Sequence, residues 1–405
     1  MGVSTDKEKI NELLTRGVEA VYPSPEAFFK KLKSGKKLRI YVGFDPTAPD
    51  LHIGHALQLR KLKQFQDLGH EVIMLIGSFT AMIGDPTDKM ATRKQLTQKQ
   101  VLTNAAGYKK QASKIISFTG ENPAKLMFNH KWLGKMSFAD VVELASHFTV
   151  QQMSERDMFE RRIKAGEPVY VHEFMYPLMQ GYDSVEMDVD AELGGSDQTF
   201  NMLAGRTLLK RMKDKEKCII ALKLLENDEG KKMSKSEGGF IALNDLPEDM
   251  FGKIMAMDDS MILPYFEIAT DITMDEIEGI KLGLKRGLNP RDVKARLAKI
   301  LVEMYHSKSA AEKAEKHFES VFKKHEMPDD MPEYYLDQPE SIVEVLLNCG
   351  LASSKSEARR LLSQKAIKVD GVVAEDSDMK LVGQEGGIVL QRGKRQFVRI
   401  KKSNI

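Results

Sequence analysis

Two apolar segments separated by an amphipathic helix constrain the fold more than any other feature of this sequence. Residues 37–44 (KLRIYVGF) are rich in β-branched and aromatic residues, which is typical of a strand. Residues 71–79 (EVIMLIGSF) are almost continuously apolar, as expected of a strand that is covered on both faces. Between them, apolar residues at helical spacing predict a helix over 52–68, and Gly69 is a stop signal. This β-α-β unit predicts an α/β fold with a parallel sheet.

The chain is too long for one ordinary hydrophobic core. Its 405 residues predict two or three domains. Residues 97–190 show mostly helical patterns, 218–225 (CIIALKLL) predict a late buried strand, and 247–325 are again helical. Three prolines within 326–339 predict a linker, and a small unit of mixed structure is expected at 340–405.

Charge and cysteine content exclude several classes of protein. Lys and Arg number 61 against 59 Asp and Glu, a net charge of +2, so a wholly basic nucleic-acid binder is excluded. The two cysteines, Cys218 and Cys349, give neither a disulfide framework nor a zinc motif. The N-terminal residues lack the apolar core of a secretory signal, and no apolar run reaches membrane-spanning length. We therefore expect a cytoplasmic protein with no membrane partner.

The polar turn after the first strand has the composition of a phosphate site. In residues 41–55 (YVGFDPTAPDLHIGH), His52 and His55 flank Gly54 where the predicted helix begins. A helix N-terminus offers unpaired N–H groups and partial positive charge to a phosphate, and glycine allows a nucleotide to approach closely. The alternative is a metal shared by the two histidines. No third ligand stands near them in sequence, so phosphate binding is favoured.

A second loop carries a lysine cluster. Residues 228–239 (DEGKKMSKSEGG) place Lys231, Lys232 and Lys235 among serines and glycines. A lysine cluster is often only a solvated surface. Here the ammonium groups suit the negative charge that develops on a departing pyrophosphate.

Together these two loops resemble the HIGH and KMSKS motifs of class I aminoacyl-tRNA synthetases. The segments IGDPTDKMATR (83–93), YPLMQGYD (176–183) and GGSDQ (194–198) further resemble the tyrosyl-tRNA synthetase family, in its order and over most of the chain. Thr199-Phe200-Asn201 stands where many bacterial members have Trp-Gly-Asn, and the KMSKS sequence is unaltered. In both features the chain resembles the second bacterial subtype of this family.

The segment 176–183 is expected to bind and select the amino-acid substrate. Tyr176, Gln180 and Asp183 share one face of a helix. A polar outer face is the alternative, but apolar neighbours favour a buried helix whose polar groups need partners. A buried acceptor at Asp183, with Tyr41 nearby, could bind a phenolic hydroxyl and reject phenylalanine. Tyrosyl-tRNA synthetase is the standard example of such rejection.

The resemblance assigns further roles residue by residue. Asp183 and Tyr41 would hold the tyrosine hydroxyl, and Asp85, Tyr176 and Gln180 its ammonium group. The full set expected around tyrosine is Tyr41, Thr80, Asp85, Tyr176, Gln180, Asp183 and Gln198. The set expected around ATP is Gly43, Asp45, His52, Gly54, His55, Gly195, Asp197, Lys232 and Lys235. The set expected to act on the transferring phosphate and pyrophosphate is Thr47, His52, His55, Lys89, Arg93, Lys232 and Lys235.

The C-terminal segment 341–371 resembles an S4 RNA-binding domain. Residues 340–405 hold 12 Lys and Arg against 8 Asp and Glu. The positions expected to contact RNA phosphates are Lys355, Arg359, Arg360, Lys365 and Lys368. A solvated amphipathic helix is the alternative.

The resemblance implies a Rossmann-like catalytic domain at 1–240, with a helical insertion at about 120–190 that forms a homodimer interface. A helical anticodon-side domain at 241–325, a linker at 326–339 and an α+β S4 domain at 340–405 would follow. The implied reaction joins L-tyrosine to ATP, with Mg²⁺ and no permanently bound cofactor or protein metal site, and then charges tRNA(Tyr). A tryptophanyl-tRNA synthetase and an inactive synthetase-like RNA-binding protein remain the alternatives.

Overall fold

The computed structural model describes residues 2–86, 95–226, 240–322, 331–393 and 396–403. The chain divides into two units, Met1–Glu315 and Lys316–Ile405, and each is treated by itself. The division falls within helix α17 (Lys308–Phe322). No helix in the described ranges is long and apolar enough to cross a membrane.

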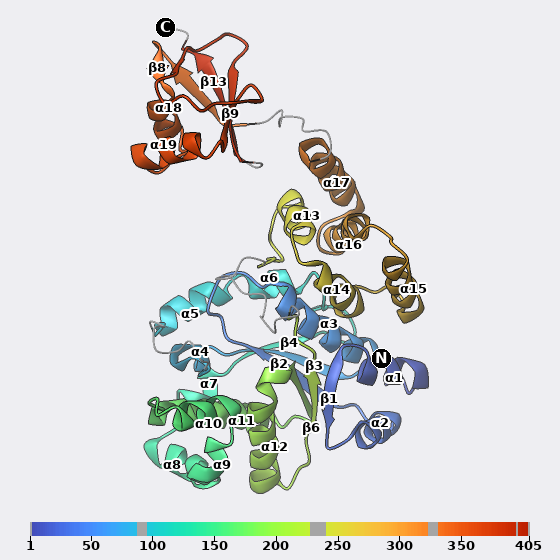
Figure 1. The fold of residues 1–405 in the computed structure, drawn as a ribbon. Coiled ribbons are helices and arrows are strands. Elements are labelled where there is room, and N and C mark those ends of the chain that lie inside the picture. The colour runs from blue at the N-terminus through green and yellow to red at the C-terminus, as the bar shows by residue number, and fades with distance from the viewer. Residues whose placement is uncertain (1, 87–94, 227–239, 323–330, 394–395, 404–405) are drawn as a thin grey trace. The chain divides into compact units, whose positions relative to one another are not determined.

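A six-stranded sheet forms the centre of the first unit, with strand order β1-β6-β5-β2-β3-β4 (Figure 1). The strands are β1 (Val18–Tyr22), β2 (Arg39–Phe44), β3 (Glu71–Ile76), β4 (Lys125–Phe128), β5 (Ala191–Gly195) and β6 (Cys218–Leu222). The strands predicted at 37–44, 71–79 and 218–225 are confirmed as β2, β3 and β6. The prediction of a parallel sheet holds for five strands, but β1 pairs antiparallel with β6.

The order of the strands reverses between β5 and β2. The connection from β2 to β3 runs through α3 (Ile53–Asp67), and the connection from β5 to β6 runs through α12 (Thr199–Lys213). Right-handed crossovers that proceed in opposite directions place these helices on opposite faces of the sheet. A crevice therefore opens at the carboxyl ends of β2 and β5, which is where ligands bind in open α/β sheets.

The segment expected to be a helical insertion contains a strand. Residues 125–128 form β4, which pairs parallel with β3, so the helices of the segment expected at about 120–190 begin only after this strand. Short helices follow β4: α7 (His130–Leu133), α8 (Phe138–Ser146), α9 (Val150–Ser154) and α10 (Asp157–Lys164). They lead into the long helix α11 (Val171–Glu186).

The other helices of the first unit surround this framework. Capping explains several of their starts: α2 and α16 have proline at the first helical position after Ser24 and Asn289, whose side chains accept backbone N–H groups. They are α1 (Lys7–Thr15), α2 (Pro25–Lys33), α4 (Thr80–Ile83), α5 (Gln98–Ala105), α6 (Tyr108–Ala112), α13 (Pro247–Met255), α14 (Ile262–Ala269), α15 (Met274–Lys285) and α16 (Pro290–Tyr305), with 3₁₀ turns at Ser196–Gln198 and Asp259–Met261.

Helices α11 and α12 lie side by side (Figure 1) and are in close contact at two glycines, Gly181 and Gly205. A Cβ atom on Gly181 would lie 2.8 Å from Cδ1 of Leu208 and 3.1 Å from the backbone nitrogen of Gly205. Both contacts are closer than ordinary van der Waals distance. The absence of side chains at this crossing therefore sets the distance between the two helices.

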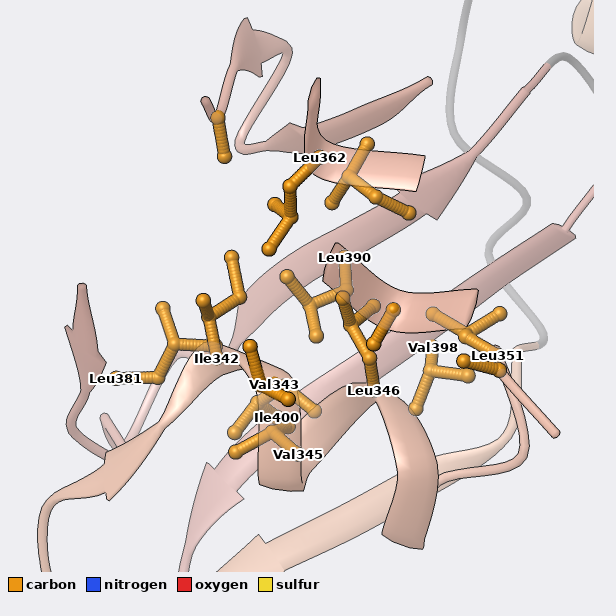
Figure 2. Packing of buried hydrophobic residues seen from close by; sticks show 14 of the residues in the cluster. Ile342, Val343, Val345, Leu346, Leu351, Leu362, Leu381, Leu390, Val398 and Ile400 are labelled. Carbon is orange, nitrogen blue, oxygen red and sulfur yellow. The ribbon is translucent and has the colours of Figure 1, made fainter. Parts of the chain in front are cut away.

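The second unit has its own hydrophobic core. Its sheet has the order β10-β9-β12-β13-β7, and a two-stranded sheet pairs β11 with β8. The strands are β7 (Glu333–Leu336), β8 (Glu340–Ser341), β9 (Ile367–Val369), β10 (Val372–Val373), β11 (Lys380–Leu381), β12 (Ile388–Arg392) and β13 (Gln396–Lys402), and the helices are α18 (Ile342–Asn348) and α19 (Lys355–Ser363). Figure 2 shows Leu346, Leu390 and Ile400, all fully buried, among the side chains packed between helices and sheet.

The prediction of a linker over 326–339 is wrong for its second half. Residues 333–336 form β7, which pairs parallel with β13. The prolines that suggested a linker are compatible with this strand because Pro332 lies just before it, where its carbonyl accepts the N–H of Arg399. Residues 326–330 lie outside the described ranges.

We predict that Gly181→Ala lowers the free energy of unfolding by about 1–3 kcal/mol, because the added methyl group would overpack the α11–α12 crossing. Gly279→Ala on α15 is the matched control: nothing lies within 4 Å of the place that its Cβ atom would take, so helix propensity should raise stability by up to about 1 kcal/mol. Urea unfolding of both variants measures the difference. Equal stability of the two variants would contradict the close approach.

Candidate active site

The site begins where β2 ends and α3 starts. His52 is the N-cap of α3, and its Nδ1 accepts the N–H of Gly54 at 3.0 Å. The Nδ1 of His55 accepts the N–H of His52 at 3.2 Å. A ring nitrogen that accepts a hydrogen bond carries no proton, so each neutral imidazole carries its hydrogen on Nε2.

This arrangement makes both histidines neutral donors. Burial, together with the neighbouring His52, holds the pKa of His55 well below its usual range. The ring centroids lie 3.8 Å apart. Two Nε2–H groups beside a helix N-terminus suit the oxygens of a phosphate group.

A cavity of about 210 Å³ lies beside these histidines. Five of the residues predicted around ATP line it: His52, Gly54, His55, Gly195 and Asp197. They come from the start of α3 and the end of β5, the two places that the strand order brings together. Sequence reasoning missed the apolar part of the lining, which includes Leu222, Leu224 and Phe240.

Asp183 lies buried on α11, with 2% of its surface exposed. Its Oδ1 accepts the indole N–H of Trp132 at 2.7 Å, and its Oδ2 accepts the amide of Asn129 at 3.2 Å. Burial raises the pKa of Asp183 well above its usual range, while these two donors act in the opposite direction. The side chain is therefore a buried acceptor held in one orientation.

Hydrogen bonds connect Asn129 to Asp45, which directly follows β2. The amide of Asn129 also donates to Oγ1 of Thr80 at 3.1 Å, and Thr80 donates to Oδ1 of Asp45 at 2.7 Å. The hydroxyl of Tyr176 donates to Oδ2 of Asp45 at 2.9 Å. Burial raises the pKa of Asp45 to about 7, against the effect of the Thr80 and Tyr176 hydrogen bonds. Residues predicted separately around tyrosine and ATP thus lie in one network.

Asp85 accepts two hydrogen bonds from side chains. Arg156 donates to its Oδ1 at 2.8 Å, and Gln198 donates to its Oδ2 at 2.8 Å. Asn201 donates to the carbonyl oxygens of both Gln198, at 2.9 Å, and Gln180, at 3.0 Å. The carboxylate expected to hold the substrate ammonium is therefore oriented by an arginine from the segment between α9 and α10.

The hydroxyl of Tyr41 lies 2.9 Å from Oγ of Ser184, one residue beyond Asp183. Sequence reasoning missed Ser184, Trp132, Asn129, Arg156 and Asn201. One signal was present for Trp132, since it is the single tryptophan of the chain. Its contact with Asp183 crosses 51 positions, and no local pattern reports such a distance.

The remaining predicted residues fall into two groups. Thr47 and Gly43 are exposed near the carboxyl end of β2 and do not appear in the lining of the cavity beside the histidines. Lys89, Arg93, Lys232 and Lys235 lie outside the described residues. Within the described ranges, no group of three His, Cys, Asp or Glu side chains could hold a metal ion.

The predicted RNA-contacting residues lie on the second unit. Lys355 and Arg359 are one turn apart on α19, and both are exposed. Three of the five contact a carboxylate: Lys355 with Glu344 at 2.5 Å, Lys365 with Glu375 at 2.9 Å, and Arg360 with Glu357 at 4.0 Å. Exposed ion pairs of this kind are weak and can open to phosphate.

The sequence and structure match known proteins over most of their length. Residues 33–323 match the model of class I tRNA synthetases (W and Y), and residues 323–400 match the tyrosine–tRNA ligase SYY-like C-terminal domain. The chain is 46% identical to the tyrosine–tRNA ligase of Carboxydothermus hydrogenoformans, covering 96% of this chain and 97% of that protein. It is 45% identical to that of Thermotoga maritima, covering 98% of both.

A solved structure supports the fold. The tyrosyl-tRNA synthetase of Archaeoglobus fulgidus, complexed with L-tyrosine, aligns with a TM-score of 0.60 and 25% identity, covering 76% of this chain and 99% of that one. The family match spans both sides of the crevice and the buried network around Asp183. The chain belongs to the class I tRNA synthetase family that serves tryptophan and tyrosine.

Proposed function

We propose that the protein is a tyrosine–tRNA ligase. It joins the carboxylate of L-tyrosine to the α-phosphate of ATP, releases pyrophosphate, and transfers the tyrosyl group to the 3′ end of its tRNA. The observation that carries the choice of amino acid is the buried carboxylate of Asp183, held by Trp132 and Asn129. The tyrosine–tRNA ligases that resemble the chain over nearly its whole length support the same choice.

Selection of tyrosine follows from the cost of burying an unpaired polar group. The phenolic hydroxyl of the substrate donates to Asp183 and accepts from Tyr41, whose side chain is 1% exposed. Phenylalanine fills the same space but offers no hydrogen-bond donor to Asp183 and no acceptor to Tyr41, so a hydrogen bond is lost at each group in a desolvated pocket. At the other end of the substrate, Asp85, Tyr176 and Gln180 hold the ammonium group, and Gln198 keeps Asp85 in place.

The first chemical step needs no protein nucleophile. The substrate carboxylate attacks the α-phosphorus of ATP, which enters as its magnesium complex, and pyrophosphate leaves. His52 and His55 direct their Nε2–H groups to the phosphate oxygens, where negative charge builds in the transition state. We assign the departing pyrophosphate to Lys89, Arg93, Lys232 and Lys235 on the likeness of their motifs alone.

The second unit supplies tRNA contacts. We propose that Lys355 and Arg359 on α19, with Arg360, Lys365 and Lys368, bind the phosphate backbone. Helices α13 to α17 are assigned to the anticodon side of the tRNA. Both cysteines are free, which suits a reducing cytoplasm.

The protein acts as a homodimer through its helical insertion. That segment carries six exposed large apolar side chains: Phe138, Val142, Val150, Ile163, Tyr170 and Val171, at 50–83% exposure. Phe138 and Val142 are one turn apart on α8 and share a face. An accumulation of apolar surface of this kind is typical of a protein–protein interface.

The test of the proposed function is ATP–pyrophosphate exchange with each amino acid in turn. The wild-type protein should support exchange with tyrosine and with no other. Asp183→Asn keeps the shape of the side chain but removes its charge, so KM for tyrosine should rise at least about tenfold while KM for ATP stays within about twofold. Exchange with tryptophan, or with no amino acid, would refute the proposal.

The tRNA contacts predict a variant with a selective defect. Lys355→Gln/Arg359→Gln should lower kcat/KM for tRNA charging about tenfold, because two phosphate contacts are lost. The slope of log(kcat/KM) against log salt concentration should become shallower by about 2. Tyrosine-dependent exchange should be unchanged. Lys7→Gln/Lys9→Gln, on exposed positions of α1, is the control for total charge. A normal charging rate in the first variant would show that α19 does not bind tRNA.

The dimer is tested by light scattering after gel filtration. The wild-type chain should have the mass of a dimer, and Phe138→Glu/Val142→Glu should shift it to a monomer, because two charges would be buried without partners at the interface. Leu282→Glu/Leu288→Glu changes two exposed leucines outside the insertion and should leave the mass unchanged. A dimer that survives the α8 variant would place the interface elsewhere.

A further inference from the structure

We propose that the buried ion pair of Lys217 and Glu192 positions side chains of the amino-acid pocket. The pair orients Gln180 directly and Tyr41 through Ser184. Glu192 lies on β5, and Lys217 directly precedes β6. Neither residue was predicted from the sequence as part of the site. The inference rests on the proposed function, because it assigns the pair a part in reading tyrosine.

The two charges are removed almost completely from water. Lys217 is 0% exposed and Glu192 is 2% exposed. Nζ of Lys217 contacts Oε2 of Glu192 and donates to Oγ of Ser184 at 2.8 Å. Burying such a pair costs several kcal/mol per ion, and a pair of apolar residues is often equally stable. Stability alone therefore does not account for its place beneath α11.

The carboxylate of Glu192 fixes the amide of Gln180. Nε2 of Gln180 donates to Oε1 of Glu192 at 3.0 Å, and Oε1 of Gln180 accepts from Asn201 at 3.0 Å. Reversing the amide would set its oxygen against the carboxylate and its NH₂ group against that of Asn201. The charge on Glu192 thus selects one orientation of a side chain proposed to hold the substrate ammonium.

The ammonium of Lys217 holds Ser184, which is the hydrogen-bond partner of Tyr41. A lysine ammonium can only donate, so Ser184 must accept from it. The same Ser184 oxygen lies 2.9 Å from the hydroxyl of Tyr41, and the Ser184 hydroxyl donates to Oε2 of Glu192 at 3.4 Å. The ion pair therefore holds the hydroxyl of Tyr41 beside Ser184, next to Asp183, at the end of the pocket proposed to bind the phenolic hydroxyl of the substrate.

The packing of α12 leaves room for the ammonium. A Cβ atom on Gly205 would lie 2.5 Å from Nζ of Lys217 and 3.0 Å from Oγ of Ser184. The same glycine forms the close crossing with Gly181 on α11. Helix packing and the position of the ion pair are therefore set at one place.

The test removes both charges together, so that neither is left buried alone. In Glu192→Met/Lys217→Met, KM for tyrosine in the exchange assay should rise about tenfold, and the preference for tyrosine over phenylalanine should fall about tenfold. KM for ATP should stay within about twofold. Thermal unfolding establishes that the variant is folded.

Arg162→Met/Glu173→Met is the matched control. This ion pair is also largely buried, with 14% and 2% side-chain exposure, and Glu173 lies at the start of the same helix α11. KM for tyrosine should be unchanged there. If the Glu192/Lys217 variant does not fold, Ser184→Ala isolates the second arm: selectivity against phenylalanine should fall about tenfold with the ion pair retained.

Three results would overturn the inference: an unchanged KM and selectivity in the folded variant, equal losses for tyrosine and ATP, or the same change in the control. A wild-type protein that activates no tyrosine would instead refute the proposed function, before any variant is compared.

Discussion

The reversal of strand order between β5 and β2 is the constraint on which the rest of the first unit depends. It brings the end of β5, with Gly195, next to the turn that leads into α3, with His52. Residues more than 140 positions apart then line one cavity. Because the helices on either side of the reversal cover opposite faces, the crevice has two walls of different origin. One wall supplies the start of a helix, and the other supplies a glycine-rich strand end.

Burial of polar groups is the second organising factor. Asp45 follows β2, Asp183 lies on α11 and Glu192 lies near the start of β5, and each carboxylate accepts at least two hydrogen bonds. The donors come from different parts of the chain, so satisfying the carboxylates fixes those parts against one another. The need of buried carboxylates for hydrogen-bond donors thus explains both the fixed arrangement of the pocket and its selectivity for a hydroxyl group.

The sequence was informative where the signal is local. Strands β2, β3 and β6 and helix α3 follow from apolar patterns that each fit within one element. Strand β5 (AELGG) was not predicted because glycine is rare in strands and hides the pattern. Strand β4 was not predicted because four residues are too few to show the alternation of a strand. The motifs around His52 and Asp183 could be found from the sequence through a family resemblance. The partners that hold Asp183 could not, because Asn129 and Trp132 reach it across 54 and 51 positions.

The pairing of β7 with β13 has a consequence for how the second unit assembles. β13 lies between β12 and β7 in the sheet, although β7 is the first of these strands in the chain and β13 the last. The edge strand β7 and its neighbour β13 are separated by about sixty residues, and contacts between such distant segments slow folding. Helices α18 and α19 share one hydrophobic core with strands of this sheet. The surface proposed to bind RNA therefore rests on a sheet that is complete only when the first and last strands of this unit have paired.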